Sequence, residues 1–179
     1  MRLSSRCASD GTGGLEGTTE RRESRLAGMA EVRLEAMTEQ EFGPWRAEAE
    51  AHYARSVTSS GVPADVAAAE AAETYANLLP DGPATVGHHI WHAYDGDRRV
   101  GFLWLKFSGR GAFVYNVAVE PELRRQGYGR AIMEAGERWS RENGASTIGL
   151  HVFAHNHGAL SLYEQLGYAE TGRKMAKQL

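Results

Sequence analysis

The sequence contains very little sulfur, because its 179 residues include a single cysteine, Cys7. One thiol excludes an intrachain disulfide and a metal site built from several cysteines, and it fits a reducing cytoplasm. No apolar run is long enough to span a bilayer, and Met1 to Asp10 lack the apolar segment of a secretory signal. An excess of positive charge is also lacking, since the net charge is −3. We therefore expect a cytoplasmic protein with neither a membrane nor a nucleic-acid partner.

Large apolar side chains are scarce in residues 1–28, which are rich in Arg, Ser, Gly, Thr and Glu. A segment of this composition buries too little surface to offset the entropy lost on ordering it. Regular patterning starts immediately after Met29. We therefore expect residues 1–28 to be a disordered N-terminal extension and residues 29–179 to form one folded domain.

From Glu31 onward, patterns typical of strands and helices follow one another. Thr38 and Glu41 form a capping-box signature that predicts a helix start, and Asp95-Gly96-Asp97 predicts a turn between strands. The predicted strands are Val32 to Ala36, His88 to Tyr94, Arg99 to Phe107, Ala112 to Glu120, Thr147 to Phe153 and Tyr168 to Leu179. The predicted helices run from Thr38 to about Ser59, from Pro63 or Asp65 to about Leu79, from Gly127 to about Glu142 and from Asn156 to Gln165. This order predicts an α/β fold with a mixed sheet flanked by helices.

The segment Arg124-Arg125-Gln126-Gly127-Tyr128-Gly129-Arg130 lies between a predicted strand and a predicted helix. Glycines let a backbone approach a ligand closely, and a helix start offers unpaired N–H groups with a partial positive charge. Together with the arginines, these features suit a pyrophosphate. A tight turn with solvated arginines would show the same pattern. A Rossmann or Walker A loop is excluded, because further glycines and a Gly-Lys-Ser/Thr sequence are absent.

The spacing Arg124-x-x-Gly127-x-Gly129 resembles the signature of the GNAT superfamily of acetyl-CoA-dependent N-acetyltransferases. A second stretch, which runs from Leu150 through Asn156 and Tyr163 to Tyr168, is similar to the strand and helix that follow in that family. The resemblance implies a mostly antiparallel sheet in which the strands Ala112 to Glu120 and Thr147 to Phe153 are parallel neighbours. These two strands are expected to splay apart and to bind acetyl-CoA in the gap between them.

The same resemblance implies which residues bind the cosubstrate. The backbone of Val117, Ala118 and Val119 is expected to bond the pantetheine arm as an added strand would. The pyrophosphate is expected to lie against Arg124, Arg125, Gln126, Gly127, Tyr128, Gly129 and Arg130. Asn156 and Tyr163 are expected to contact the cofactor as well, and the family's chemistry requires no metal.

Tyr163 occupies the position of the general acid in the family, where it would reprotonate a leaving thiolate. A phenol suits this role because its pKa of about 10 keeps it protonated at neutral pH. Spacing alone favours a core residue, since Tyr163 shares the apolar face of its predicted helix with Ala159, Leu160 and Leu166, and only the family resemblance favours the catalytic role.

The general base is an open choice between His151, Glu120 and a water relay. An amine that is protonated at neutral pH must lose a proton before it attacks, and a histidine with a pKa of about 6.5 suits that task. His151 stands where ribosomal-protein alanine N-acetyltransferases of the superfamily carry a glutamate. It could instead be a hydrogen-bonded structural histidine on a buried strand, and Glu120 could be a solvated loop residue.

Several histidines invite a metal hypothesis, including His88, His92 and the pair His155 and His157. Metal sites need three or four converging ligands, so we expect these to be scattered surface histidines and predict no metal. We expect the acceptor to be the primary amine of a small molecule. A protein N-terminus or lysine is the alternative acceptor, and a non-catalytic CoA-binding regulatory module is the alternative function. Tyr168 to Leu179 has room for one long strand or two very short ones, and a homodimer is possible.

Overall fold

The computed structural model describes residues 31–173 and residue 175. The extension expected over residues 1–28 lies outside the described residues. The strands are β1 (Arg33–Ala36), β2 (His88–Asp95), β3 (Arg98–Ser108), β4 (Gly111–Val119) and β5 (Thr147–Leu150). The α-helices are α2 (Glu39–Thr58), α3 (Ala64–Leu78), α4 (Tyr128–Glu142) and α5 (His157–Gln165), with short 3-10 turns η1 (Gly82–Ala84) and η2 (Pro121–Leu123). In this part of the chain, no helix has the length and apolarity needed to cross a membrane.

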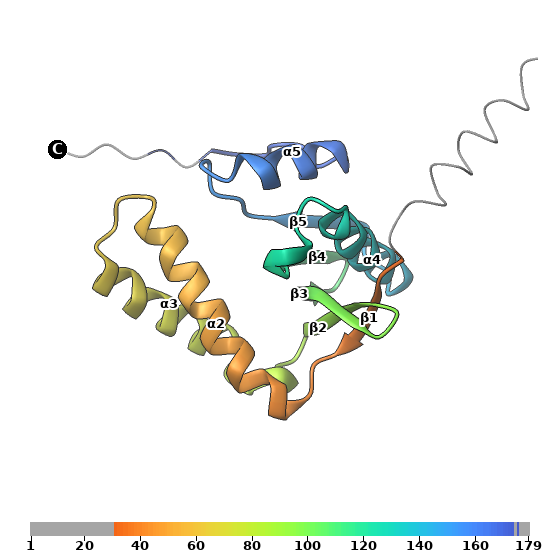
Figure 1. The fold of residues 1–179 in the computed structure, drawn as a ribbon, viewed down its shortest axis with the longest axis horizontal. Helices are drawn as coiled ribbons and strands as arrows, with labels where there is room; N and C mark the ends of the chain where they lie inside the picture. Colours follow the sequence, from red (N-terminus) through yellow and green to blue (C-terminus); the bar gives the residue numbers. More distant parts are fainter. Residues whose placement is uncertain (1–30, 174, 176–179) are drawn as a thin grey trace, which may run out of the picture. The chain divides into compact units, whose positions relative to one another are not determined.

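The five strands form one sheet in the order β1-β2-β3-β4-β5 (Figure 1). The first three pairings are antiparallel, and β4 pairs with β5 in parallel. The parallel pairing begins at Gly111 opposite Thr147 and ends at Val114 opposite Leu150, whereas β4 continues to Val119. The predicted mixed, mostly antiparallel sheet with a splayed parallel pair is therefore confirmed.

A β-bulge in β4 lies at the point where the parallel pairing ends. Trp104 pairs with Asn116, but the next residue, Leu105, pairs with Val114, so Tyr115 is the extra residue. A bulge bends its strand and increases the local twist. The bulge at Tyr115 therefore coincides with the separation of β4 from β5.

Helices cover both faces of the sheet, with α4 on one side and the pair α2 and α3 on the other (Figure 1). Alternating residues of β3 show this division. Leu103 faces α4, because a Cβ added at Gly136 would lie 2.5 Å from Leu103 Cδ2. Trp104 faces α2, where its ring meets that of Trp45 edge-on at 5.8 Å. Both β3 residues are at most 1% exposed, so the core lies on both faces of the sheet.

The start of α2 confirms the predicted capping box. The Glu41 carboxylate accepts hydrogen bonds from the Thr38 backbone N–H at 2.9 Å and from the Thr38 hydroxyl at 2.6 Å. These bonds satisfy a donor that a helix start would otherwise leave unpaired. They also fix the Glu41 side chain in position over the sheet.

The prediction of a last strand over Tyr168 to Leu179 is wrong for its described residues, 168–173 and 175, which form no strand. The predicted strand that starts at Thr147 is also shorter than expected, because β5 ends at Leu150. A short β5 offers little edge for a further strand to pair with. After α5, the chain instead turns at Gly167, whose φ is +92°, and Tyr168 N–H bonds back to the Tyr163 carbonyl at 2.9 Å.

Candidate active site

The glycine loop, defined here as residues 124–130, leads from η2 into the first turn of α4. Gly127 is the N-cap of α4 and has a φ of +92°, in the left-handed region that residues with a Cβ rarely adopt. Arg125 also has a positive φ, of 65°. The loop therefore depends on Gly127 for its backbone conformation.

Gly129 has a different role, because its lack of a side chain lets α5 pack closely. A Cβ there would lie 3.3 Å from Leu162 Cδ2 on α5 and 3.7 Å from Val119 Cγ2 on β4. Arg130 donates a hydrogen bond to Gln165 Oε1 at 2.9 Å, also across to α5. The start of α4, the end of β4 and α5 thus meet at this loop.

The loop has donors for an anion in its backbone. As the first residues of α4, Tyr128, Gly129 and Arg130 have N–H groups with no acceptor within the helix. The positive end of the helix dipole adds to their attraction for a negative group. The side chain of Arg124 donates to the Val119 carbonyl at 3.4 Å, and that of Gln126 donates to the Glu122 carbonyl at 3.1 Å. Tyr128 is held by a 2.7 Å hydrogen bond from its hydroxyl to Asp95 Oδ2.

The edge of β4 beyond the bulge is the second feature of the site. Val117, Ala118 and Val119 pair with Leu103, Phe102 and Gly101 of β3 on one side only. On the other side the parallel pairing with β5 has already ended at Val114. The outward backbone groups of this stretch have no partner in β5, so an extended ligand could bond them as a strand does.

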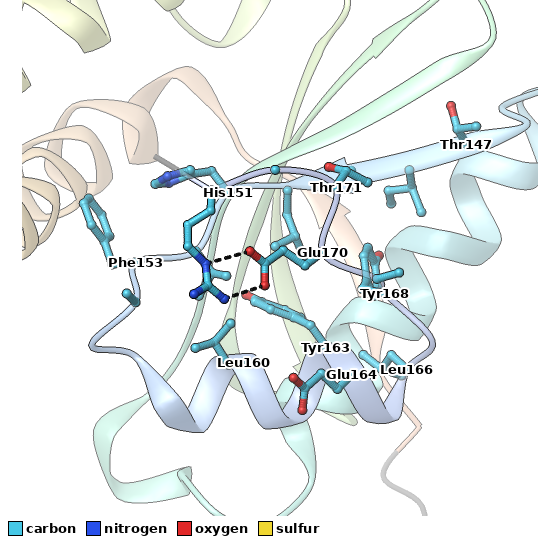
Figure 2. Close-up of a pocket in the computed structure, with 18 of the residues that line it drawn as sticks. Thr147, His151, Phe153, Leu160, Tyr163, Glu164, Leu166, Tyr168, Glu170 and Thr171 are labelled. Carbon is cyan, nitrogen blue, oxygen red and sulfur yellow. Dashed lines mark hydrogen bonds and ion pairs between the residues drawn. The ribbon is translucent and has the colours of Figure 1, made fainter. Parts of the chain in front are cut away.

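Tyr163 lies on α5 and lines a cavity of about 1530 Å³ (Figure 2). His151 lines the same cavity, which includes every residue of β5 but neither β4 nor the glycine loop. Glu120 and Asn156 do not line it either. Helix α5 therefore contacts the glycine loop through Leu162 and contributes Tyr163 to the cavity. Burial raises the pKa of the Tyr163 phenol, which keeps it protonated at neutral pH.

His151 lies just beyond the end of β5 and is exposed. Its ring meets that of Phe153 edge-on, with 5.3 Å between the centroids. The alternative that His151 is a structural histidine on a buried strand is therefore wrong. The Phe153 ring in turn packs against that of Tyr53 on α2, with 6.3 Å between the centroids. Helix α2 therefore borders this end of the cavity.

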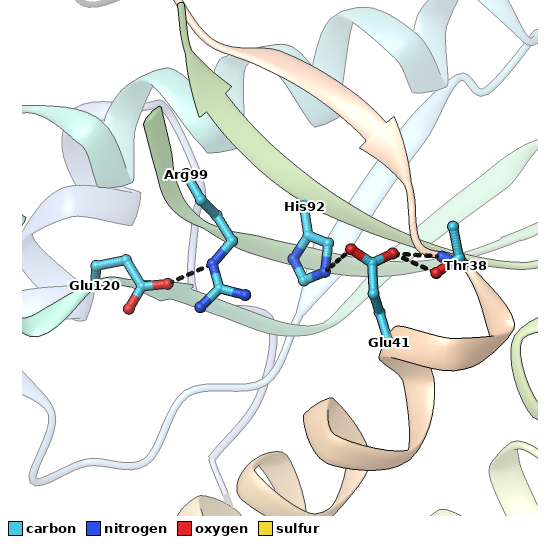
Figure 3. A network of polar contacts seen from close by, with 5 residues as sticks. All are labelled: Thr38, Glu41, His92, Arg99 and Glu120. Carbon is cyan, nitrogen blue, oxygen red and sulfur yellow. Dashed lines mark hydrogen bonds and ion pairs between the residues drawn. The ribbon is translucent and has the colours of Figure 1, made fainter. Parts of the chain in front are cut away.

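Glu120 follows β4 directly and is engaged by an arginine of β3. Its Oε1 accepts a hydrogen bond from Arg99 Nε at 2.9 Å, and its side chain is 27% exposed. Figure 3 shows this pair beside a second pair, His92 and Glu41. The alternative of a freely solvated loop residue is wrong, because Glu120 is partly buried and paired with Arg99 of β3.

Asn156 is the N-cap of α5, where its Oδ1 accepts a hydrogen bond from the Ala159 N–H at 3.2 Å. This bond gives the residue a structural function that spacing alone did not predict. It satisfies one of the unpaired donors of the first turn and so supports the helix that carries Tyr163.

The expectation of scattered surface histidines is wrong for His88 and His92, each of which is only 6% exposed. Trp104 donates from Nε1 to Nδ1 of His88 at 3.0 Å, and the two rings belong to an aromatic cluster under α2 and α3. No group of three or more potential metal ligands gathers within the described residues. Sequence reasoning missed the ion pair of His92 with Glu41, because the two residues are far apart in sequence and only the Thr38–Glu41 capping box hinted at it.

Comparison with known proteins gives a consistent set of similarities. The model of the acetyltransferase (GNAT) family matches residues 58–168. YdgE of Bacillus subtilis, named as an N-acetyltransferase, is 35% identical over 152 residues, which cover 82% of this chain and 97% of YdgE. YycN of the same organism, also named as an N-acetyltransferase, is 32% identical over 155 residues, covering 83% and 99% of the two chains. The crystal structure of YycN superposes with a TM-score of 0.78 over 83% of this chain and 98% of that one.

A shorter similarity is to the ribosomal protein bS18-alanine N-acetyltransferase of Escherichia coli. It is 42% identical over 59 residues, which cover 33% of this chain and 40% of that enzyme.

Proposed function

The chain belongs to the acetyltransferase (GNAT) family, and from that premise we propose that it transfers the acetyl group of acetyl-CoA to the primary amine of a small molecule by direct attack. One observation carries the proposal. The glycine loop at the start of α4 and the edge of β4 beyond its pairing with β5 lie at the same end of the splayed strands, and α5 packs beside them.

The residues at this place fit acetyl-CoA. Gly127 provides the left-handed turn and Gly129 the space, so the N–H groups at the start of α4 are accessible to a pyrophosphate. Arg124, Arg125 and Arg130 add positive charge around it. Val117, Ala118 and Val119 form the stretch proposed to bond the pantetheine arm, where the Val119 carbonyl now accepts a hydrogen bond from Arg124. When bound, acetyl-CoA supplies the thioester carbonyl that an amine can attack.

Tyr163 is the proposed general acid. Its hydroxyl holds a proton at neutral pH, because burial raises the pKa of the phenol above its usual value of 10.0. It is carried by α5, which is anchored to the first turn of α4 through Leu162 and Gln165. A proton at this position is available to a leaving thiolate.

His151 is the proposed proton acceptor for the incoming amine. It is exposed and shares the cavity with Tyr163. Glu120 is the less suitable candidate, because its carboxylate already accepts a hydrogen bond from Arg99 at 2.9 Å. Asn156 is proposed to support the site by capping α5, in addition to the cofactor contact expected from the family.

A protein N-terminus is the second candidate acceptor. The observation that favours it is the 42% identity over 59 residues to an enzyme that acetylates an alanine of a ribosomal protein. The match spans only part of both chains, so it supports a shared cofactor-binding segment more directly than a shared acceptor.

Three further features are proposed. The transferase domain comprises residues 29–179. The location is cytoplasmic, which the single cysteine supports. The enzyme can form a homodimer.

The deciding experiment is an amine panel with detection of the free thiol. We expect thiol release that depends on both acetyl-CoA and an amine, with small primary amines preferred over peptides. Tight binding of CoA without thiol release on any amine would instead favour a non-catalytic CoA-binding module. Preference for a peptide with an N-terminal alanine would favour the protein acceptor.

A further inference from the structure

A hydrogen bond between distant parts of the chain ties the glycine loop to the hairpin of β2 and β3. The hydroxyl of Tyr128, the first residue of α4, donates to Asp95 Oδ2 at 2.7 Å. The two residues are 33 positions apart in the sequence. The side chains of Arg124 and Gln126, in contrast, bond to carbonyls only five and four residues before them. The bond to Asp95 therefore fixes the loop to a part of the sheet that these local bonds do not reach.

The backbone of the loop needs such support. Arg125 has a φ of 65°. A residue with a Cβ is unfavourable in this left-handed region and stays there only where surrounding contacts determine its conformation. Gly127, with a φ of +92°, adopts the same region two residues later. The N–H groups proposed to bind the pyrophosphate follow directly, at the start of α4, so their direction depends on how this turn is held.

Contacts hold the first turn of α4 from two directions. Gly129 packs against Leu162 of α5, and Arg130 donates to Gln165 of the same helix at 2.9 Å. Tyr128 reaches the hairpin of β2 and β3 instead. Successive residues of an α-helix point about 100° apart, so these neighbours can engage different elements. The bond from Tyr128 therefore supplies a direction of support that α5 does not.

Asp95 is well placed as an anchor. It is the last residue of β2 and pairs with Arg98 of β3, so strand pairing restricts its backbone. The bond to Asp95 raises the pKa of Tyr128 above its usual 10.0, so the phenol keeps the proton that it donates at neutral pH. A carboxylate near a site for an anion would oppose binding by its charge. The benefit of Asp95 therefore lies in the bond that it accepts.

We propose that Tyr128 and Asp95 are positioning residues for the cosubstrate, because their hydrogen bond holds the first turn of α4 in the conformation that receives the pyrophosphate of acetyl-CoA. This inference rests on the proposed function. Neither residue has a part in the proposed proton transfers. Loss of their bond should therefore weaken binding of the cosubstrate and leave the chemical step intact.

Tyr128→Phe tests the bond, because it removes the hydroxyl and keeps the ring. We expect KM for acetyl-CoA to rise at least about fivefold, while kcat at saturating acetyl-CoA stays within about twofold of wild type. Asp95→Ala should give the same loss. Asp95→Asn keeps an oxygen that can accept the bond and should bind acetyl-CoA at least as well as wild type. Asp97→Ala, at an exposed position of the same turn, is the matched control and should behave as wild type.

Shortened donors show where the effect acts. Acetyl-dephospho-CoA keeps the pyrophosphate, whereas S-acetylpantetheine lacks it. Tyr128→Phe should therefore lower kcat/KM at least about fivefold with the first donor and leave kcat/KM unchanged with the second. A purely structural role would lower both. Equal losses with the two donors, or a KM for acetyl-CoA equal to that of wild type, would overturn the proposal while leaving the transferase intact.

Calorimetric titration with CoA tests the same residues without the reaction. Tyr128→Phe and Asp95→Ala should each weaken CoA binding at least about fivefold, and Asp95→Asn should not. If no amine is acetylated but CoA binding shows this pattern, the proposed reaction fails and the positioning role stands. If acetylation proceeds and all variants bind CoA equally, the positioning role alone fails.

Discussion

Gly129 on α4 and Leu162 on α5 are in contact at the centre of the proposed cofactor site, where a Cβ on Gly129 would lie 3.3 Å from Leu162 Cδ2. The glycine keeps the start of α4 close to the helix that carries Tyr163. Since φ at Gly129 is not in the left-handed region, only space opposes a larger residue there. The loop and the acid are therefore coupled through this packing contact.

Gly129→Ala should push α5 away and weaken acetyl-CoA binding, with a KM for acetyl-CoA about tenfold higher. Leu162→Ala in the same chain should restore part of the loss, because it removes the methyl group that the new Cβ meets. A double-mutant cycle on KM measures this coupling. Additive effects of the two substitutions would show that the contact does not link the loop to α5.

Gly127→Ala should act through the backbone instead. A Cβ there meets no atom within 4 Å, but the φ of +92° is unfavourable for alanine. The expected loss is roughly 1–2 kcal/mol of unfolding free energy. Gly127→Asn is the matched variant, because asparagine adopts left-handed conformations more readily, and it should lose less. Chemical denaturation of the two variants checks the order.

Local features of this arrangement could be predicted from the sequence, whereas non-local ones could not. The capping box of Thr38 and Glu41, the glycine loop and the order of strands and helices were predictable, because each depends on residues close together in the chain. The burial of His88 and His92 was not, because it depends on α2 and α3 folding over β2. The last strand was predicted wrongly for its described residues, since strand formation needs a partner edge, and β5 proved too short to provide one.

The buried histidines should make the fold sensitive to acid. The pKa of His88 is lowered from its usual 6.5 to about 4, mainly by burial and to a smaller extent by the nearby Lys106 and His89. Between these values the unfolded chain binds a proton that the folded protein does not. The stability contributed by His88 is therefore complete above pH 6.5 and is lost as the pH falls towards 4. The pKa values of His89 and His92 are also lowered by burial, which adds to the same trend.

His88→Gln tests this assignment, because a glutamine carbonyl can still accept the hydrogen bond from Trp104 Nε1. Unfolding free energies measured from pH 7 to pH 4 should fall less steeply for this variant than for the wild type. Parallel curves for the two proteins would assign the acid sensitivity to other groups.

Asn156 should matter for α5 as a cap. Asn156→Ala removes the acceptor of the Ala159 N–H and should cost about 1 kcal/mol of stability. Asn156→Asp keeps an acceptor and should retain that stability. If the aspartate variant is stable but binds acetyl-CoA more weakly, the amide also contacts the cofactor, as the family resemblance implies. Thermal unfolding and CoA titration of the pair separate the two roles.

Tyr163 and Tyr168 offer a matched test of the general acid, since both line the cavity and their rings lie 5.7 Å apart. Burial raises the pKa of both phenols, so both are protonated at neutral pH. Only Tyr163 is expected to deliver its proton.

Tyr163→Phe should lower kcat about 100-fold or more with little change in acetyl-CoA affinity, because general acids contribute at least about this factor. Tyr168→Phe removes a buried hydroxyl that lies beside the Glu137 carboxylate, so it should affect stability but leave kcat within about twofold of wild type. Equal losses in the two variants would mean that the cavity needs its phenols for packing, whereas a Tyr163→Phe enzyme of normal kcat would assign the proton to another group, such as a water molecule.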